Sequence, residues 1–368
     1  MFIARGAICR VGRLRAVRFH EYGTADVLRY DEVADPVPGS SEVVIRVAAC
    51  SIQHSDLDVR AGQSRFPLDL PHTLGLEYSG EIVEMGSDVS GLAVGDRVVS
   101  RYQVHCGTCR WCRSGNESLC DNAAIPGIHC PGGYAEYAAI DARGVARLPE
   151  GISLLAAAAK NSLTTAWHAL TARADLHPGE WVLVNAAGSG VGSAGVQIAR
   201  LLGAVVIASA GSSEKLDRAR AEGADFGIDY GAGDLRERVL ELTEGRGVDV
   251  VLECVGGDLF SESLSALSKN GRLVVVGAHG GEVVPLDLIS VFRNQWTVCG
   301  SLRSTPAELD RVLDLILKGD LRPVIDRTMP LEDAAAGHRL LEERLAYGKV
   351  LLEPKPLDAA LEAESHVS

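Results

Sequence analysis

The chain has 368 residues, of which 46% are apolar and 23% are charged, and it carries a formal net charge of −13 at pH 7. This length predicts two domains, because single hydrophobic cores stop growing at about 250–300 residues. The acidic balance argues against nucleic acid or an anionic membrane surface as a partner, and the sequence has no apolar run of the roughly 18 residues that span a membrane. Nine cysteines, mostly scattered singly outside one cluster, indicate reduced thiols and predict a cytoplasmic protein.

The first part of the chain has the pattern of strands and turns. Residues 1–14 contain arginine but no acid, lack the apolar centre of a signal peptide, and are expected to form an N-terminal extension. From residue 15 to residue 155, short β-branched or alternating segments are separated by glycine, proline and aspartate. They predict a β-rich domain of the rolled or barrel-like kind. The clearest segments are residues 27–33, 42–50, 78–86, 96–102 and 134–140.

Four cysteines lie close together within residues 104–121. They are Cys106, Cys109, Cys112 and Cys120. Their spacing, C-x2-C-x2-C-x7-C, can close a tetrahedral shell of thiolates around one Zn²⁺, which leaves no position for water and therefore stabilises a lobe without doing chemistry. An iron–sulfur site is the main alternative, but a ferredoxin-like run places its fourth cysteine three residues on, before a proline. Chance clustering is the other alternative, and we predict one structural zinc.

From residue 156 to residue 300, predicted strands alternate with amphipathic helices. The strands are expected at residues 181–187, 204–210, 225–230, 248–256 and 272–278, and the helices at residues 191–203, 214–223, 234–245 and 259–271. This alternation predicts a doubly wound parallel sheet that is covered by helices on both faces.

The last part of the chain is expected to return to the first domain. Residues 301–355 contain a predicted helix over 307–319 and end in a predicted strand over 348–354. The segment could complete the β-rich domain. Residues 356–368 are small and polar, and we expect them to form a flexible tail.

A glycine-rich turn joins the first strand and helix of the second domain. It reads AAGSGVG and ends at Gly192. Such a turn lets the backbone approach a pyrophosphate, which then lies at the positive N-terminus of the helix. Ala187 and Ser189 occupy the first two glycine positions of the dinucleotide fingerprint, so a purely structural turn is the alternative. The strand–turn–helix context favours cofactor binding by Gly188, Ser189, Gly190, Val191 and Gly192.

The end of the second strand bears on the choice of cofactor. An NAD site has a carboxylate there, which binds the ribose hydroxyls. The nearest acid is Glu214, but it follows Ser212 and Ser213 and is therefore expected in the first turn of a helix. The two serines and Lys215 could instead receive a 2′-phosphate. We therefore favour NADPH over NAD.

The order of these motifs resembles the medium-chain dehydrogenase/reductase superfamily, which includes zinc alcohol dehydrogenases and quinone or enoyl reductases. The resemblance covers almost the whole chain, and rests on the cysteine lobe and on LGLEYSGEIVEMG, GDRVV, GGYAEY, AAGSGVGSAGVQIARLLGA and GRGVDVVLECVGG. It implies an α/β protein in which a Rossmann domain is inserted in a GroES-like, β-rich catalytic domain. The active site would lie in the cleft between them, and a homodimer or homotetramer would be usual.

The chain departs from this family at the catalytic zinc. Zinc alcohol dehydrogenases bind that metal with cysteine, histidine and cysteine, and the matching positions here are Gln53, Leu76 and Asn161. A zinc that acts as a Lewis acid needs protein ligands such as thiolate or imidazole and one open position. The amides of Gln53 and Asn161 and the hydrocarbon side chain of Leu76 therefore predict the loss of this metal.

The resemblance and this departure together imply a reaction. Without a Lewis acid, carbonyl–alcohol interconversion is harder, whereas hydride delivery to a conjugated C=C or a quinone is less demanding. We therefore expect an NADPH-dependent reductase of enones, enoyl groups or quinones. One alternative is an alcohol dehydrogenase that works through Ser55 and His54, without metal or with one improvised by His54, Asp56 and Glu77. Another is a non-enzymatic, NADPH-binding structural protein.

The resemblance also implies roles for single residues. Ser55 stands at the family's proton-relay hydroxyl position, and Gln53 and His54 are the other polar groups expected to face substrate. Capping of the following helix is the alternative role for this loop, and Asp56 matches a residue beside the cleft. The cofactor residues that the resemblance adds are Thr165 behind the nicotinamide, Ser212, Ser213, Lys215 and Tyr230 around the adenosine phosphate, and Gly277 and Ala278 beside the nicotinamide ribose. The substrate and the proton donor stay open.

Overall fold

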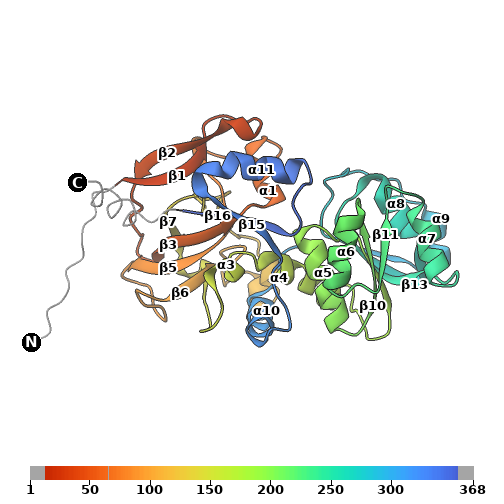
Figure 1. Cartoon of the computed structure of the whole chain (residues 1–368). Helices are drawn as coiled ribbons and strands as arrows, with labels where there is room; N and C mark the ends of the chain where they lie inside the picture. The colour runs from red at the N-terminus through yellow and green to blue at the C-terminus, as the bar shows by residue number, and fades with distance from the viewer. Residues whose placement is uncertain (1–12, 65, 355–368) are drawn as a thin grey trace, which may run out of the picture.

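The computed structural model describes residues 13–64 and 66–354, which form two lobes side by side (Figure 1). One lobe is rich in β-strands and contains both ends of the described chain, and the other holds a parallel sheet between helices. The first strand, β1 (Arg13–Phe19), begins inside the segment expected to be an N-terminal extension, so residues 13 and 14 belong to the fold. The predicted tail lies outside the described residues. Among the described residues, no helix has the length and apolar character that a membrane crossing requires.

The β-rich lobe is built on a seven-stranded sheet, in which six strands follow the order β15-β16-β3-β5-β6-β8 and β7 pairs with β3. A smaller sheet, β2-β1-β4, packs beside it. Apolar side chains on the inner faces of these strands form the core, with Ile45, Ile82 and Val98 fully buried. The remaining bounds are β2 (Leu28–Ala34), β3 (Glu42–Ser51), β4 (His72–Thr73), β5 (Glu77–Met85), β6 (Arg97–Ser100), β7 (Tyr137–Asp141), β8 (Val145–Arg147), β15 (Ile325–Pro330) and β16 (Lys349–Glu353).

The second lobe contains a six-stranded parallel sheet in the order β11-β10-β9-β12-β13-β14. Its central strands are apolar on both faces because helices cover both sides. The strand order reverses at β9, and ligands of such sheets bind outside the carboxyl ends of the strands at this point. The bounds are β9 (Trp181–Val184), α5 (Gly190–Leu201), β10 (Val205–Ala210), α6 (Ser213–Ala221), β11 (Phe226–Asp229), α7 (Leu235–Leu242), β12 (Val248–Glu253), α8 (Gly257–Ser265), β13 (Leu267–Val275), α9 (Leu288–Asn294) and β14 (Thr297–Gly300).

One predicted boundary in this lobe is wrong. The pattern predicted a helix over residues 259–271, but α8 ends at Ser265 and β13 begins at Leu267. The reason is strand pairing, because Leu267 pairs with Val248 of β12 and draws the chain out of the helix.

The chain passes between the lobes twice. Going out, it runs through α4 (Asn161–Trp167) and the π-helix η4 (His168–Arg173). Coming back, α10 (Pro306–Lys318) packs against α4, and β16 then pairs with β3, where Leu352 lies opposite Cys50. The C-terminal segment therefore adds two strands to the first sheet (Figure 1). The other helices are η1 (Ala25–Val27), α1 (His54–Arg60), α2 (Arg110–Arg113), η2 (Glu117–Leu119), η3 (Ala142–Gly144), α3 (Leu154–Ala157), η5 (Leu331–Asp333) and α11 (Ala334–Glu342).

Candidate active site and metal centre

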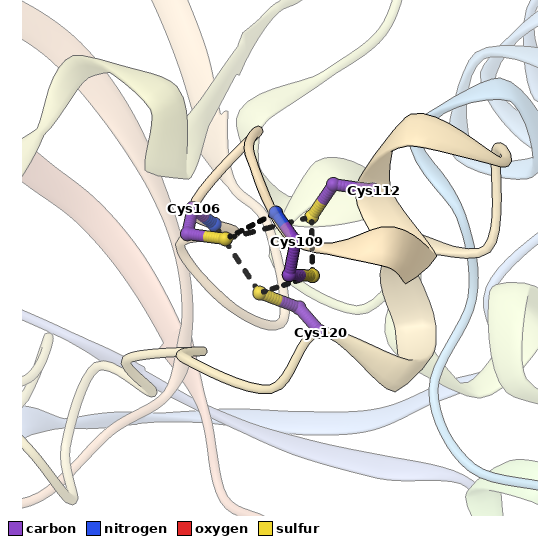
Figure 2. A group of neighbouring side chains, drawn as sticks. All are labelled: Cys106, Cys109, Cys112 and Cys120. Carbon is purple, nitrogen blue, oxygen red and sulfur yellow. Dashed lines mark hydrogen bonds between the residues drawn. The ribbon is translucent and has the colours of Figure 1, made fainter.

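The four clustered cysteines point their sulfur atoms toward one another (Figure 2). All four Sγ atoms lie within 4.8 Å of one another. The Sγ–Sγ distances are 3.9 Å for Cys106–Cys112, 3.6 Å for Cys109–Cys112 and 4.0 Å for Cys109–Cys120. A tetrahedral zinc with Zn–S bonds of about 2.3 Å holds its sulfur atoms about 3.8 Å apart. The cysteine cluster therefore has the donor type and the spacing that a structural zinc requires.

Short local elements set this geometry. Cys109 is the N-cap of α2, and Cys120 directly follows η2. Backbone N–H groups of Thr108 and Cys109 each donate to Cys106 Sγ at 3.4 Å, which favours the thiolate that a metal needs. None of the four cysteines lines the main cavity described below, so a metal here would support the lobe.

The chain is expected to contain about one zinc per molecule, and Cys112→Ser should remove it. Loss of the metal should lower the melting temperature by about 5 °C or more, because metal binding stabilises the folded lobe. Elemental analysis and thermal unfolding check this, with Cys299→Ser as a control that keeps both the metal and the stability. Iron with visible absorbance in the wild type would instead favour the iron–sulfur alternative.

A cavity of about 420 Å³ lies where the two lobes meet. Gln53, His54 and Ser55, at the start of α1, line it on the side of the β-rich lobe, together with Lys349 of β16. The turn before α5 lines it on the side of the parallel sheet. The cavity therefore lies at the carboxyl end of β9, where the sheet order reverses. The sequence resemblance predicts the active site in this cleft.

The glycine-rich turn forms one wall of the cavity, to which Gly188, Ser189, Gly190 and Val191 contribute. Ser189 is the N-cap of α5 and its Oγ accepts from Gly192 N at 3.0 Å, whereas the first N–H groups of a helix have no intrahelical acceptor and can bind an anion. A Cβ on Gly190 would lie 2.5 Å from a neighbouring hydroxyl oxygen, so this surface must stay bare. These features fit a dinucleotide pyrophosphate.

Gly192 contributes in another way. It does not line the cavity, and a Cβ there would lie 2.1 Å from Ala186 O. Its role is to let α5 pack closely on the end of the preceding strand.

The adenosine end of the cavity is basic. Gly211, Lys215, Tyr230 and Arg344 line it, and Lys215 Nζ donates to Arg344 O at 2.6 Å. Among the described residues that line the cavity, the one carboxylate is Asp58. This end therefore offers cations to a phosphate.

The two serines predicted beside this phosphate are placed differently. Ser212 and Ser213 are not among the lining residues, and Ser212 is the N-cap of α6, where its Oγ accepts from Lys215 N at 3.3 Å. Glu214 lies in the first turn of α6, as expected. The serines thus shape the helix start, and of these three predicted residues Lys215 is the one that lines the cavity.

The opposite end of the cavity contains Thr165 of α4, Gly277 and His279, whereas Ala278 does not line it. The ring of His54 lies 4.8 Å from that of His279. Burial, the neighbouring His279 and nearby cations lower the pKa of His54 to about 4. His54 is therefore neutral at pH 7 and can offer a hydrogen bond but not a positive charge.

The three positions that match catalytic zinc ligands do not share one open site. Gln53 lines the cavity, but its Nε2 donates to Glu77 Oε2 at 2.5 Å and to Ser51 Oγ at 3.0 Å. Leu76 is 1% exposed and belongs to the core. Asn161 lines a separate pocket of about 20 Å³. Its Oδ1 accepts from Lys160 Nζ at 2.6 Å, and its buried Nδ2 has no hydrogen-bond partner.

Two buried lysines lie on either side of Glu77, the acid that Gln53 and Asn161 contact. Lys160 Nζ lies 3.6 Å from Glu77 Oε1, and Lys349 Nζ lies 3.6 Å from Glu77 Oε2. Burial lowers the pKa of Lys160 to about 8 and also lowers the pKa of Lys349. Two ammonium groups beside one carboxylate repel a further dication, so the residues present do not fit a catalytic zinc.

The improvised metal site of His54, Asp56 and Glu77 is not formed either. Asp56 is buried away from the cavity, and its carboxylate accepts from Gln53 N at 2.8 Å and from Gly75 N at 3.3 Å. Its pKa is raised to about 6, chiefly by burial. Within the described residues, the cysteine cluster is the one group of three or more metal-binding side chains that come close together. Asp56 is thus a positioning residue, which caps α1 and fixes the first helical turn that carries Ser55.

Sequence reasoning missed several wall residues. Lys349, Arg344, His279, Arg303 and Tyr102 all line the cavity, and they come from segments far apart in the chain. Lys160 offered a local signal, since it ends the apolar run ISLLAAAAK, where a lone charge is unusual.

Comparisons with known proteins agree with the architecture. The family model for the alcohol dehydrogenase GroES-like domain matches residues 39–150, and the model for zinc-binding dehydrogenase matches residues 190–318. The chain is 31% identical to an NAD-dependent alcohol dehydrogenase of Sulfolobus acidocaldarius, covering 92% of this chain and 99% of the relative. It is also 31% identical to the acryloyl-coenzyme A reductase of Metallosphaera sedula, covering 87% and 95%. The crystal structure of an NAD-dependent alcohol dehydrogenase matches with a TM-score of 0.88 and 40% identity, covering 92% and 99%.

The parallel sheet, the glycine-rich turn and the cavity between the lobes define a dinucleotide-dependent oxidoreductase. The chain belongs to the medium-chain dehydrogenase/reductase family, and the predicted fold class is confirmed. The relatives are named for an alcohol in one case and for acryloyl-coenzyme A in the other, so family membership leaves the substrate class open.

Proposed function

We propose that this protein is an NADPH-dependent reductase that delivers hydride to a conjugated C=C of an enone or enoyl compound, or to a quinone, without a catalytic zinc. The observation that carries the proposal is the Lys160–Glu77–Lys349 group, which puts two cations beside Gln53 and Asn161, two of the positions that match catalytic zinc ligands. A fixed ammonium group can stabilise the negative charge that develops on an enolate or quinol oxygen.

Different residues on the cavity wall have different proposed roles in the reaction. NADPH, when bound, supplies the hydride. Lys349 is the wall cation closest to Glu77, and its Nζ also donates to Ile52 O at 3.2 Å, which fixes the ammonium group in place to stabilise the substrate oxygen. Ser55 adds a hydroxyl that can pass a proton, and Thr165 supports the nicotinamide.

Zinc content and activity measured on one sample test this proposal. About one zinc per chain together with NADPH oxidation by an enone, an enoyl thioester or a quinone supports it. Two zincs with chelator-sensitive alcohol oxidation would overturn it. NADPH binding without turnover of enones, quinones, aldehydes or alcohols would favour the structural-protein alternative.

The second candidate is an alcohol dehydrogenase, which the names of several relatives favour. Without a metal it would need a base to remove the alcohol proton; Ser55 could pass that proton, but His54, whose pKa is lowered to about 4, is a weak acceptor for it. Reduction of NADP⁺ by primary or secondary alcohols that survives chelator treatment identifies this activity.

The basic adenosine end predicts a preference for NADPH. Lys215→Ala should raise the KM for NADPH roughly 10–100-fold, because it removes a charge-assisted hydrogen bond to phosphate, and should change the KM for NADH little. Steady-state kinetics with both cofactors check this, with Glu214→Gln as a control that changes neither. A wild type that prefers NADH would contradict the assignment.

We also propose that the protein is a homodimer or homotetramer. Strand β14 is the edge of the parallel sheet, and Val298 on it and Phe292 on α9 are exposed. Exposed edges with large apolar side chains favour pairing with another chain. The wild type should elute as an oligomer in size-exclusion chromatography with light scattering, and Val298→Asp should shift it toward monomer, whereas Val94→Asp, on a loop of the other lobe, should not.

A further inference from the structure

The loop after β14 brings a guanidinium group to the cavity. Ser301 and Arg303 line the cavity together with Tyr102 from the β-rich lobe. Arg303 Nη1 donates to Gln103 Oε1, and the guanidinium carbon lies 5.5 Å from the centre of the Tyr102 ring. Both contacts hold the guanidinium in a fixed place where the two lobes meet.

This guanidinium has unsatisfied hydrogen-bonding capacity. Arg303 Nε and Ser301 Oγ are buried and have no hydrogen-bond partner. Among the described residues, no carboxylate forms an ion pair with Arg303, and burial lowers its pKa, although arginine stays protonated. Keeping a cation buried without a counter-ion is costly, so an anion that enters the cavity would find a strong partner here.

The other cations of the cavity wall already have a partner or a proposed role. Lys215 and Arg344 lie together at the adenosine end, and Lys349 is paired with Glu77. The one carboxylate of the wall, Asp58, lies 3.7 Å from His279. In a chain whose net charge is −13, the described residues of the cavity wall include four cations and one carboxylate, a balance that favours anions. The proposed cofactor would bring a phosphate partner to the cations of the adenosine end, but it brings no anion to Arg303.

We propose that Arg303 and Ser301 bind an anionic group of the substrate, a carboxylate or a phosphate, beside the reacting C=C. This inference rests on the proposed function and narrows it to anionic substrates. A guanidinium suits this task because its planar set of N–H donors matches two oxygens of a carboxylate or phosphate at once, and the Ser301 hydroxyl can donate a third hydrogen bond.

Two matched substrate pairs test the proposal and separate the two anions. The first pair is (E)-4-oxopent-2-enoic acid and its methyl ester, and the second is crotonyl-coenzyme A and crotonyl-pantetheine. The wild type should favour the anionic member of at least one pair by roughly 10–100-fold in kcat/KM, as expected for hydrogen bonds to a charged group. The pair that shows the preference identifies the anion.

Arg303→Gln should remove that preference mainly through KM and leave the neutral member unchanged, whereas Arg303→Lys should restore part of it. Arg238→Gln, which changes an exposed arginine of α7, is the matched control. Equal use of both members of both pairs by the wild type, or an equal loss on all four substrates in Arg303→Gln, would overturn the proposal.

A binding experiment separates this inference from the proposed function. The saturated counterpart of the preferred substrate, which is 4-oxopentanoate for a carboxylate site or the phosphate ester butyryl-coenzyme A for a phosphate site, should bind the NADPH complex measurably in titration calorimetry, and Arg303→Gln should weaken that binding about tenfold or more. Turnover of neutral enones with no anion preference and no binding of saturated acid or phosphate ester would refute the inference alone. Anion binding that depends on Arg303 without turnover of any enone or quinone would refute the proposed function alone.

Discussion

Glu77→Gln should lower the free energy of unfolding by about 3–5 kcal/mol at pH 7, because it leaves two buried ammonium groups without their common carboxylate. Glu77 is fully buried, and Ser51 Oγ, Gln53 Nε2 and Asn161 N all donate to its oxygens. Glutamine has the shape of glutamate but no charge. Its NH₂ group would also face one of the three groups that now donate to Glu77, so that two hydrogen-bond donors would point at each other.

This loss should shrink as the pH rises. In the variant, a lysine can remove its unpaired buried charge by losing its proton. The free-energy cost of doing so is set by the difference between the lysine's usual pKa of 10.5 and the pH. That cost is about 4.8 kcal/mol at pH 7 but only about 2 kcal/mol at pH 9, since one pKa unit corresponds to about 1.36 kcal/mol. Lowered lysine pKa values in the folded state mean that the unfolded chain binds more protons, so raising the pH favours the folded state in this range.

Urea denaturation at pH 7 and pH 9 measures both effects. Glu81→Gln is the matched control, because Glu81 lies on the same strand and pairs with Arg46 at the surface, where ion pairs contribute about 0–1 kcal/mol. The double variant Glu77→Gln, Lys160→Met should recover part of the stability, since it removes one of the stranded charges. Equal losses in Glu77→Gln and Glu81→Gln would show that the buried charges are not coupled.

The fold was predictable because its signals are local and repeated. Strands of the parallel sheet are buried on both faces, so segments such as that around Val250 and Val251 are continuous apolar runs, and the helices between them are amphipathic. The cysteine cluster and the glycine-rich turn were predictable for the same reason. Each is complete within about 15 residues, and its spacing carries the chemistry.

The charged group at the centre of the site was not predictable in this way. Lys160, Glu77 and Lys349 come from α4's N-cap, from β5 and from the last strand, and only the folded chain brings each lysine to 3.6 Å from a Glu77 oxygen. The sequence showed that positions 53, 76 and 161 have no zinc-ligating side chain, but not that two lysines lie beside Glu77. Arg303 is similar, since its partner Gln103 is 200 residues away.

Side-chain roles at helix starts were also hard to separate from ligand binding. Ser212 and Asp56 have the residue types expected in a binding site, yet each accepts a backbone N–H at the first turn of its helix. Caps and ligand contacts use the same hydrogen-bonding groups, so the sequence alone could not distinguish between them.

Lys349→Gln should lower kcat with the preferred enone, enoyl compound or quinone by roughly 100–1,000-fold, which is the usual cost of removing one fixed donor from a developing oxyanion. The KM for NADPH should change much less, because the proposed contacts of the cofactor are with Lys215 and the turn before α5. Lys318→Gln, on the exposed face of α10, is the control for loss of a lysine charge. An unchanged kcat would remove Lys349 from the reaction and leave it a purely structural partner of Glu77.

The pH profile distinguishes these two roles of Lys349. Burial lowers its pKa, so in the wild type kcat should fall on the alkaline side at a pH below the usual 10.5 of a lysine, as the ammonium group loses its proton. Lys349→Arg should recover part of the activity and move this decline to higher pH, because a guanidinium stays protonated throughout the range. A decline at the same pH in both proteins would assign it to another group, since a structural lysine has no reason to set the pH dependence of the chemical step.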